Sequence, residues 1–279
     1  MRLKVGDNHC HLNPLNGMGV KAFAKRFKES GGWFIGLVNL LSWNYGVQVN
    51  SPEDYRRVYE LTVDTAYVLR SKGLTVAVIL GPHPAELARL IESGVKPVKA
   101  VKFLTEAYRL AAKYVETGKA QGLGEVGRPH WQVPQEIVEA CNQVMGNVAD
   151  IAKELNCVVH LHTERAGLLT VEDMANRSRG LRKTVLHHAE GVYAAQAEKL
   201  GLTPSVPAKE SEITAAVTCR NVVIESDFLD DPKRPGAVVA PWSIGRLFSK
   251  LIAKGLISED AANVMLVENL LKLYGIEIE

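Results

Sequence analysis

The chain has 279 residues, of which 47% are hydrophobic, and its 33 basic and 31 acidic side chains give a formal net charge of +2 at pH 7. A chain of this length can bury a large core, and its balanced charge lacks the basic footprint of a dedicated nucleic-acid-binding module. No apolar run approaches the length of a membrane-spanning helix and no basic-then-apolar leader is present, so we expect no membrane contact. Four widely spaced cysteines favour reduced thiols and a cytoplasmic location: Cys10, Cys141, Cys157 and Cys219.

Short apolar segments alternate with longer amphipathic segments along the chain. Eight of them predict strands, at residues 3–9, 33–40, 75–80, 120–126, 157–162, 183–187, 202–206 and 221–226. Residues 52–71 and 135–155 carry apolar side chains at helical spacing. Eight strands alternating with helices are the pattern of an α/β fold of the closed (β/α)8 type, the TIM barrel. The seventh strand is the weakest prediction, because it contains two prolines. No linker divides the chain, so we expect one domain over residues 1–279.

The first predicted strand runs directly into Asp7-Asn-His9-Cys-His11. Side chains alternate between the two faces of a strand, so Asp7, His9 and His11 are expected on one face. Two imidazoles side by side on one face can share a metal ion. The opening of the chain therefore predicts part of a metal site.

The histidines lie where active sites occur in (β/α)8 barrels. All eight lie at, or a few residues beyond, the C-terminal end of a predicted strand: His9, His11, His83, His130, His160, His162, His187 and His188. Glu125 ends the fourth predicted strand, and Glu225 and Asp227 end the eighth. Imidazoles and carboxylates without thiolates suit zinc, manganese, nickel or iron, and a central carboxylate can bridge two ions about 3.5–4 Å apart.

Two further segments are interpreted from their surroundings. Gly122–Gly127 satisfies the dinucleotide-binding pattern G-x-G-x-x-G, but Pro129 and Pro134 delay the helix that this pattern must open, so we reject that reading. The longest irregular stretch, residues 227–241, follows the eighth strand and is a candidate rim or lid of the active site.

Taken together, these motifs resemble the signature blocks of the TatD-like metal-dependent hydrolases. The family is similar in fold to the amidohydrolases, a (β/α)8 barrel with one or two divalent ions, and its better-known members cleave DNA. The matching blocks, in chain order, are Asp7-x-His9-x-His11, Gly81-Pro-His83-Pro84, Gly124-Glu125-Val-Gly127, His162, His187 with Gly191, Glu225-Ser-Asp227 and Glu268-Asn269-Leu-Leu-Lys-Leu-Tyr-Gly275.

The resemblance implies a set of site residues. One or two divalent ions (Zn, Mn, Mg or Ni) would be held by His9, His11, Glu125, His162, His187 and Asp227. In this set His9 and His11 hold one ion, His162 and His187 hold the other, and Glu125 bridges them. Asp227 completes the first site and takes the proton of the attacking water, so Asp227 and Glu125 are the expected catalytic residues. Two alternatives stay open, because His160 shares its face with His162 and His188 could replace His187.

Departures from the family pattern concern the substrate. Glu164 stands where the family usually has an arginine, and Glu190 lies close to His187 in sequence. Carboxylates near the rim repel a phosphate, although Arg128 and Arg165 could compensate. The residues expected to contact the substrate are His83, Arg128, His130, Glu164, Arg165 and His188.

The leading hypothesis is a divalent-metal-dependent hydrolase that cleaves a phosphodiester of DNA. Its alternative keeps the barrel and the metal but hydrolyses an amide, a lactone or another ester of a small molecule. A non-catalytic metal-bound barrel is less favoured, because a closed structural site needs no proton acceptor such as Asp227. The sequence does not indicate an oligomeric state.

Overall fold

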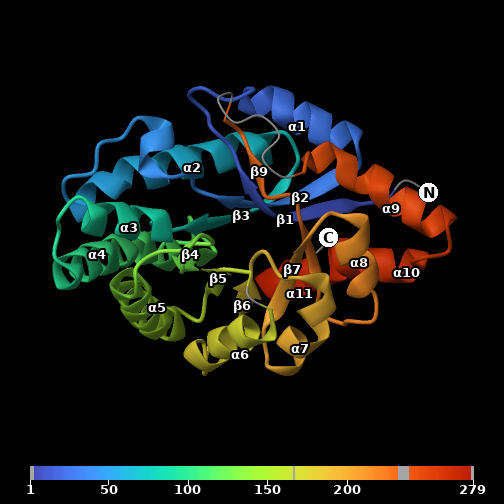
Figure 1. Ribbon diagram of the computed structural model, residues 1–279. Helices are drawn as coiled ribbons and strands as arrows, with labels where there is room; N and C mark the ends of the chain where they lie inside the picture. The colour runs from blue at the N-terminus through green and yellow to red at the C-terminus, as the bar shows by residue number, and fades with distance from the viewer. Residues whose placement is uncertain (1–2, 166, 232–238, 278–279) are drawn as a thin grey trace.

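A computed structural model describes residues 3–165, 167–231 and 239–277 of the chain. Nine parallel strands form one curled sheet in the order β8-β7-β6-β5-β4-β3-β2-β1-β9 (Figure 1). The strands are β1 (Val5–His11), β2 (Gly32–Val38), β3 (Thr75–Leu80), β4 (Gly122–Gly127), β5 (Val158–His162), β6 (Thr184–Leu186), β7 (Thr203–Pro207), β8 (Val223–Glu225) and β9 (Phe228–Leu229).

The seam of the barrel, where the two ends of the sheet meet, lies where β1 meets β8 and β9. β9 pairs with β1 through Cys10 with Phe228 and His11 with Leu229. Just before β9, the amide of Asp227 donates to the carbonyl of His9 at 2.9 Å. The fold is therefore the expected single-domain (β/α)8 barrel, and its closure places Asp227 beside the Asp-x-His-x-His segment of β1.

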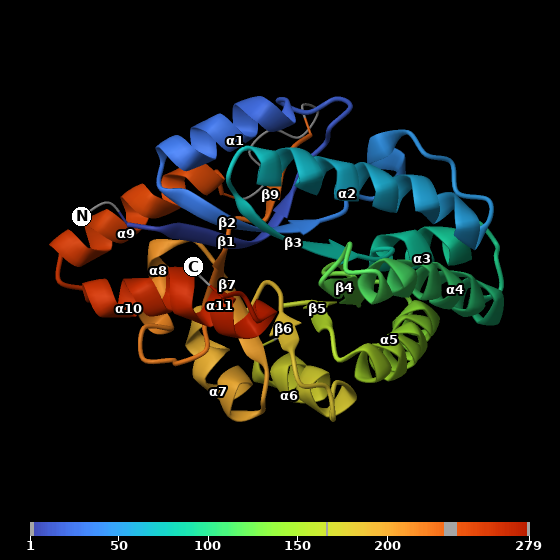
Figure 2. The ribbon, with the colours of Figure 1, turned by 180° about the vertical axis from the view of Figure 1, so that it is seen from behind.

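Helices cover the outside of the sheet, as the front and back views show (Figures 1 and 2). The α-helices are α1 (Val20–Glu29), α2 (Tyr55–Ser71), α3 (Pro84–Glu92), α4 (Pro97–Glu116), α5 (Gln135–Leu155), α6 (Leu168–Arg177), α7 (Ala194–Lys199), α8 (Glu210–Ala215), α9 (Ile244–Ala253), α10 (Glu259–Asn263) and α11 (Asn269–Tyr274). Short 3-10 turns are η1 (Ser42–Tyr45), η2 (Pro52–Asp54), η3 (Gly191–Tyr193) and η4 (Pro241–Ser243), and η5 (Val264–Glu268) is a π-helical turn that leads into α11.

All eight predicted strands are present, with ends within two residues of the predicted ones. The segment with two prolines forms β7, and Gly122–Gly127 is strand β4 rather than a phosphate loop, since α5 begins only at Gln135. β1 extends to His11, beyond its predicted end at His9. Of the candidate lid, residues 232–238 lie outside the described residues, and β9 lies within its first part.

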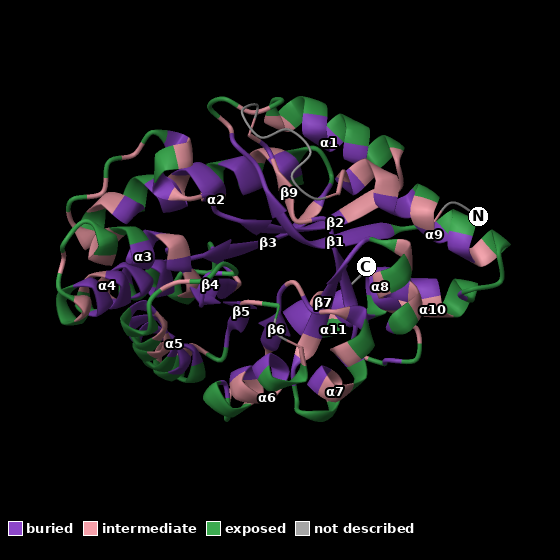
Figure 3. Cartoon of the chain, in the orientation of Figure 1, coloured by how far each residue is buried: buried purple, intermediate pink, exposed green. Residues whose placement is uncertain are grey.

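Two apolar layers hold the barrel together, and Figure 3 shows most of the sheet buried, whereas both residues of β9 are half-buried. The larger layer lies between strands and helices, and the smaller one includes inward-facing residues of β2, β3, β5, β6 and β8 together with the end of α11. Along β5 the sequence Val158, His160, His162 places every second residue on one face. The inner face therefore changes from apolar to polar toward the C-terminal strand ends, where barrel enzymes build their sites.

Two further features concern the cysteines and the length of the helices. All four cysteines are buried and free of disulfide bonds. Within the described ranges, no helix is long and apolar enough to cross a membrane.

Candidate metal centre

Glu125, near the end of β4, lies at the centre of the histidine cluster. Its Oε2 is 3.5 Å from Nε2 of His9 and 3.5 Å from Nε2 of His11. Its Oε1 is 3.3 Å from Nε2 of His187 and 4.0 Å from Nε2 of His83. The two oxygens thus face two different groups of imidazoles, which is the arrangement that a bridging carboxylate requires.

Asp227, which follows β8 by two residues, also approaches the cluster. Its Oδ1 is 3.7 Å from Nε2 of His11 and 3.9 Å from Nε2 of His187. Its Oδ2 is 3.5 Å from Nε2 of His188. The backbone of Asp227 has a positive φ of 48°, an uncommon conformation outside glycine that turns the chain at the barrel seam.

These separations fit divalent ions. Two ligand atoms that each lie about 2.0–2.2 Å from one ion are roughly 3–4 Å apart. Four residue sets have ligand atoms within 4.8 Å of one another: His9, His11 and Glu125; His83, Glu125 and His162; His187, His188 and Asp227; and His9, His187 and Glu225. In the described part of the chain, no such set contains both His162 and His187, so their sharing of one ion stays a prediction.

Hydrogen bonds to backbone carbonyls fix which ring nitrogen two of these histidines, His11 and His162, turn toward the cluster. Nδ1 of His11 faces the carbonyl oxygens of Val38 and Asn39 at 3.1 and 3.2 Å, and Nδ1 of His162 faces the carbonyl of Arg128 at 2.6 Å. A carbonyl oxygen can only accept, so Nδ1 carries the proton in both rings. The Nε2 lone pair is left for a metal ion, which is the usual outer-shell support of histidine ligands.

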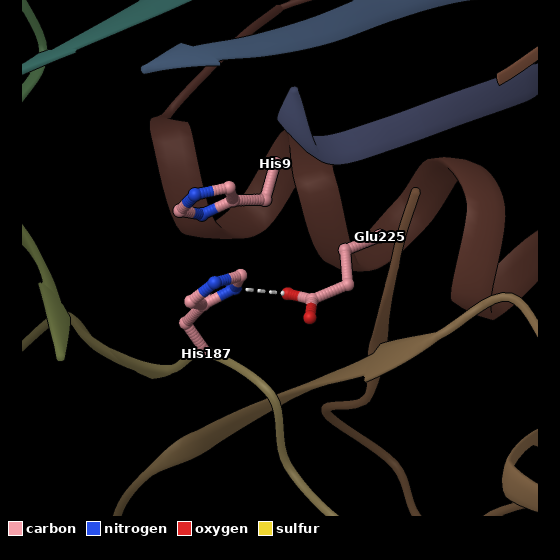
Figure 4. Close-up of side chains that lie close together, drawn as sticks. All are labelled: His9, His187 and Glu225. Atoms are coloured by element: carbon pink, nitrogen blue, oxygen red, sulfur yellow. Dashed lines mark hydrogen bonds and ion pairs between the residues drawn. The ribbon is translucent and has the colours of Figure 1, made fainter. Parts of the chain in front are cut away.

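His187 is oriented by a buried carboxylate. Its Nδ1 lies 2.8 Å from Oε2 of Glu225, which is fully buried, and its ring stacks on His9 with centroids 3.7 Å apart (Figure 4). Oε1 of Glu225 also accepts the backbone amide of His188 at 3.1 Å. Glu225 therefore holds His187 and its neighbour together, and sequence analysis placed it at this level without identifying this role.

His83 has the opposite tautomer. It caps the N-terminus of α3, where its Nδ1 accepts the amide of Ala85 at 2.9 Å. In the neutral ring the proton is then on Nε2, so His83 faces Glu125 as a hydrogen-bond donor rather than with a lone pair. The sequence His83-Pro84-Ala85-Glu86 carried a signal for this cap, because proline at the first helical position and glutamate at the third are typical of helix starts.

The electrostatics favour ionised carboxylates and neutral ligand imidazoles. Burial alone would raise the pKa of Glu125, but the surrounding histidines hold it well below its usual value, and the pKa of Asp227 is lowered by His11 and His188 against the same effect. Burial lowers the pKa of His162 and His187, and it lowers the pKa of His83 to about 4. These are the protonation states that metal ligation requires.

His11 is the exception among the imidazoles. Burial opposes its charge, but hydrogen bonding to Asp227 and the charges of Glu125 and Asp227 outweigh burial and raise the pKa of His11 to about 9. In the metal-free protein this ring holds a proton that an ion must displace.

The rim is where the substrate-contacting residues were predicted. Arg128 is buried and donates to Glu164 from Nε at 2.9 Å and from Nη2 at 2.7 Å, while its Nη1 donates to Asp173 of α6 at 2.6 Å. The guanidinium is therefore engaged by two carboxylates. His130 approaches His162, with Nδ1 3.4 Å from Nε2, and the side chain of Arg165 is exposed.

The contacts of Asp7 were not foreseen from the sequence. Asp7 belongs to none of the ligand sets, and its carboxylate is bonded to Ser226 instead. Its Oδ1 accepts the amide of Ser226 at 2.8 Å and its Oδ2 accepts the Ser226 hydroxyl at 2.5 Å. Asp7 thus fixes the residue that precedes Asp227.

A barrel whose strand ends bring imidazoles around a central carboxylate belongs to the class of metal-dependent hydrolases. The sequence model of the family described as "TatD related DNase" matches residues 6–275, and the chain belongs to this family. A relative of this chain, MJ1127 of Methanocaldococcus jannaschii, described as an uncharacterized protein, is 28% identical over 282 residues, or 99% of this chain and 98% of that protein.

Solved structures show the same fold. The TatD homologue YJJV of Escherichia coli K12 has a TM-score of 0.65 at 18% identity, covering 99% of this chain and 100% of that chain. The lactonase Lmo2620 of Listeria monocytogenes has a TM-score of 0.62 at 15% identity, covering 99% and 96%. The phosphotriesterase homology protein of E. coli, complexed with phosphate, has a TM-score of 0.64 at 14% identity, covering 98% and 99%.

Proposed function

We propose that this protein is a divalent-metal-dependent phosphodiesterase that cleaves DNA, with two ions bridged by Glu125. The observation that carries the proposal is the position of Glu125, whose two oxygens face separate groups of imidazoles at 3.3–3.5 Å. His9, His11 and Asp227 would hold one ion, and His162 and His187 the other. The family description supplies DNA as the substrate.

The chain's own groups account for the proton transfers. Ions held by these residues would lower the pKa of a water molecule toward neutrality and would polarise the phosphoryl group. Asp227, kept ionised by the neighbouring histidines, accepts the proton of that water and can return it to the leaving oxygen. His83 points an Nε2–H donor toward the cluster and can donate to a substrate oxygen.

The decisive experiment measures metal content and cleavage of single-stranded DNA in the same preparations. We expect about two ions per chain, loss of cleavage on chelation, and its return when the ion is restored. Asp227→Asn should still bind metal through the remaining ligands, more weakly at the ion that Asp227 helps to hold, and lose a factor of about 10² to 10⁴ in kcat at saturating metal. A protein that binds no metal, or an Asp227→Asn variant that cleaves at the wild-type rate, would overturn the proposal.

A second candidate is hydrolysis of an uncharged lactone or carboxylic ester at the same centre. It is favoured by Arg128, whose guanidinium is already occupied by Glu164 and Asp173 and so offers no free fork to a phosphate. A panel of lactones and esters beside single-stranded DNA separates the two candidates. A kcat/KM for any lactone that exceeds the value for a phosphodiester by 100-fold or more would select the second candidate.

We also propose a cytoplasmic location, supported by four buried cysteines that form no disulfide. Reactivity of all four thiols after denaturation of protein from a soluble cell fraction, without added reductant, is the expected result. Thiols recovered as disulfides would contradict it.

A further inference from the structure

We infer that His160 and Tyr274 are positioning residues that determine which ring nitrogen of His9 faces the metal centre; the inference rests on the proposed role of His9 as a ligand. The other inner-face ligands, His11, His162 and His187, each have an oxygen acceptor at Nδ1. His9 has none. Its Nδ1 lies 3.1 Å from Nδ1 of His160, and either nitrogen of such a pair can be the donor.

The hydrogen bonds beyond His160 remove this ambiguity. Nδ2 of Asn8 donates to the hydroxyl of Ser205 at 3.1 Å, which leaves Oδ1 of Asn8 as an acceptor, and the hydroxyl of Tyr274 donates to that Oδ1 at 2.8 Å. A tyrosine hydroxyl has one proton, so its oxygen can only accept from Nε2 of His160, which lies 2.9 Å away. The proton of the His160 ring is therefore on Nε2.

The tautomer of His160 then decides that of His9. His160 is fully buried and its hydrogen-bond partners are a tyrosine and a histidine, without a carboxylate, so the neutral ring is the stable form. A neutral ring with its proton on Nε2 has a lone pair on Nδ1, which accepts from Nδ1–H of His9. The lone pair of His9 is left on Nε2, 3.2 Å from Nε2 of His11 and 3.5 Å from Oε2 of Glu125.

The position of these residues in the barrel explains why they can act on the metal centre. Tyr274 ends α11, and its ring packs with Phe34 and the other residues of the small inner layer. His160 lies on the inner face of β5, two residues after Val158 and two residues before His162. The hydrogen-bonded series Asn8–Tyr274–His160–His9 thus connects the C-terminal helix to His9 in the cluster through buried groups.

The first test is spectroscopic and uses the intact zinc-loaded protein with 15N-labelled histidine. Long-range proton–nitrogen correlations report which ring nitrogen carries the proton. We expect a protonated Nε2 in His160 and a protonated Nδ1 in His9. The reverse arrangement in either ring would overturn the inference whatever the activity of the protein.

The second test removes the hydroxyl in Tyr274→Phe and measures the dissociation constant of each ion and the visible spectrum of the cobalt-substituted protein. Loss of outer-shell support for a histidine ligand weakens metal binding about 10- to 100-fold. We expect this loss for one ion only, together with a changed cobalt band. Tyr59→Phe is the matched control, because the buried Tyr59 hydroxyl donates to the carbonyl of Ala107, away from the cluster, and should change neither readout.

Variants of His160 separate positioning from packing. His160→Asn places a carbonyl oxygen near the position of Nδ1, so it can still accept from His9 and should retain metal affinity better than His160→Leu. Equal affinity in Tyr274→Phe and the wild type, or equal losses in His160→Asn and His160→Leu, would exclude the positioning role. A wild-type protein that binds no ion would instead refute the proposed function, so the two failures are distinguishable.

Discussion

Arg128 and Glu164 form a bidentate pair at the rim, with Nε to Oε2 at 2.9 Å and Nη2 to Oε1 at 2.7 Å. The pair is further held by the hydroxyl of Thr163, which donates to Oε2 of Glu164 at 2.8 Å, and by Asp173 on the other edge of the guanidinium. Arginine binds phosphate through two parallel N–H donors of this kind. Glu164 therefore occupies the guanidinium edge, Nε and Nη2, that a phosphodiester would need.

Releasing the arginine should therefore strengthen phosphate binding. We expect Glu164→Gln to lower the inhibition constant of inorganic phosphate about tenfold, the equivalent of about 1.4 kcal/mol. The reason is that the variant removes the charge opposite Arg128 while keeping the shape of the side chain. Inhibition of hydrolysis, or displacement of a bound fluorescent phosphate analogue, measures the change.

The control for this prediction is Asp173→Asn, which removes one charge but leaves the Glu164 fork in place. It should strengthen phosphate binding less than Glu164→Gln does. If Glu164→Gln leaves the inhibition constant unchanged, Arg128 does not reach the anion and the occupied fork has no bearing on substrate choice.

Glu225 should be as important for metal affinity as a direct ligand is. It is fully buried and it contacts His187 at Nδ1 and His188 at its backbone amide. In Glu225→Gln the charge-assisted bond to His187 is lost while every ligand residue is kept. We expect metal affinity to fall about 10- to 100-fold. Competition with a chelator of known affinity gives the number.

Glu212→Gln offers a matched control for Glu225. Oε2 of Glu212 accepts the amide of Gly191 at 2.6 Å, close in sequence to His187 but without contact to an imidazole in the described structure. Metal affinity should be unchanged in that variant. Equal losses in both variants would indicate a general effect of the loop after β6 rather than orientation of His187.

The barrel could be predicted from sequence because each strand repeats one simple pattern. Short apolar runs such as Thr75–Leu80 are buried on both faces, and the alternation of Val158, His160 and His162 needs only the period of a strand. The approach of Glu125 and Asp227 to the histidines followed from strand order alone, since parallel strands carry their C-terminal ends to the same edge.

The supporting contacts could not be predicted, because they join residues with no local relationship. Tyr274 and His160 are 114 positions apart, and Asp7 and Ser226 are 219 apart. Asp173 lies in the helical segment α6, where a carboxylate is an ordinary surface residue until Arg128 is seen to reach it. Sequence identifies residue types at strand ends, whereas the orientation of each ring depends on neighbours that only the closed barrel supplies.

Metal binding should release a proton from His11. Its pKa is raised to about 9 in the metal-free protein, and a ligand imidazole must be neutral. At pH 7.5 we expect about one proton released from this ring per chain, and the apparent affinity should rise about tenfold per pH unit up to about pH 9. Calorimetric titrations in buffers of different ionisation enthalpy count the protons.

Asp227→Asn provides the internal comparison for His11. Hydrogen bonding to Asp227 is one cause of the raised pKa of His11, so the variant should release fewer protons at pH 7.5. Proton release that is the same in both proteins would mean that the protons come from another group, such as water bound to the ion.

Asp7 should make the stability of the metal-free protein depend on pH. Burial raises the pKa of Asp7 to about 7, against the hydrogen bonds from Ser226. An acid with a raised pKa binds more protons in the folded chain than in the unfolded chain between about pH 4 and pH 7. The free energy of unfolding therefore falls as the pH rises through this window, and this contribution is constant outside it.

Asp7→Asn isolates this contribution. The amide keeps an acceptor for the backbone of Ser226 and can donate to its hydroxyl, so the seam contact survives without an ionisable group. We expect the stability of the variant relative to the wild type to increase by up to roughly 4 kcal/mol between pH 4 and pH 7, since each pKa unit corresponds to about 1.4 kcal/mol. Urea unfolding across this range measures it, with Asp150→Asn, at an exposed carboxylate, as the control for net charge. A difference between variant and wild type that does not vary with pH would show that Asp7 is ionised throughout and that the Ser226 bonds outweigh its burial.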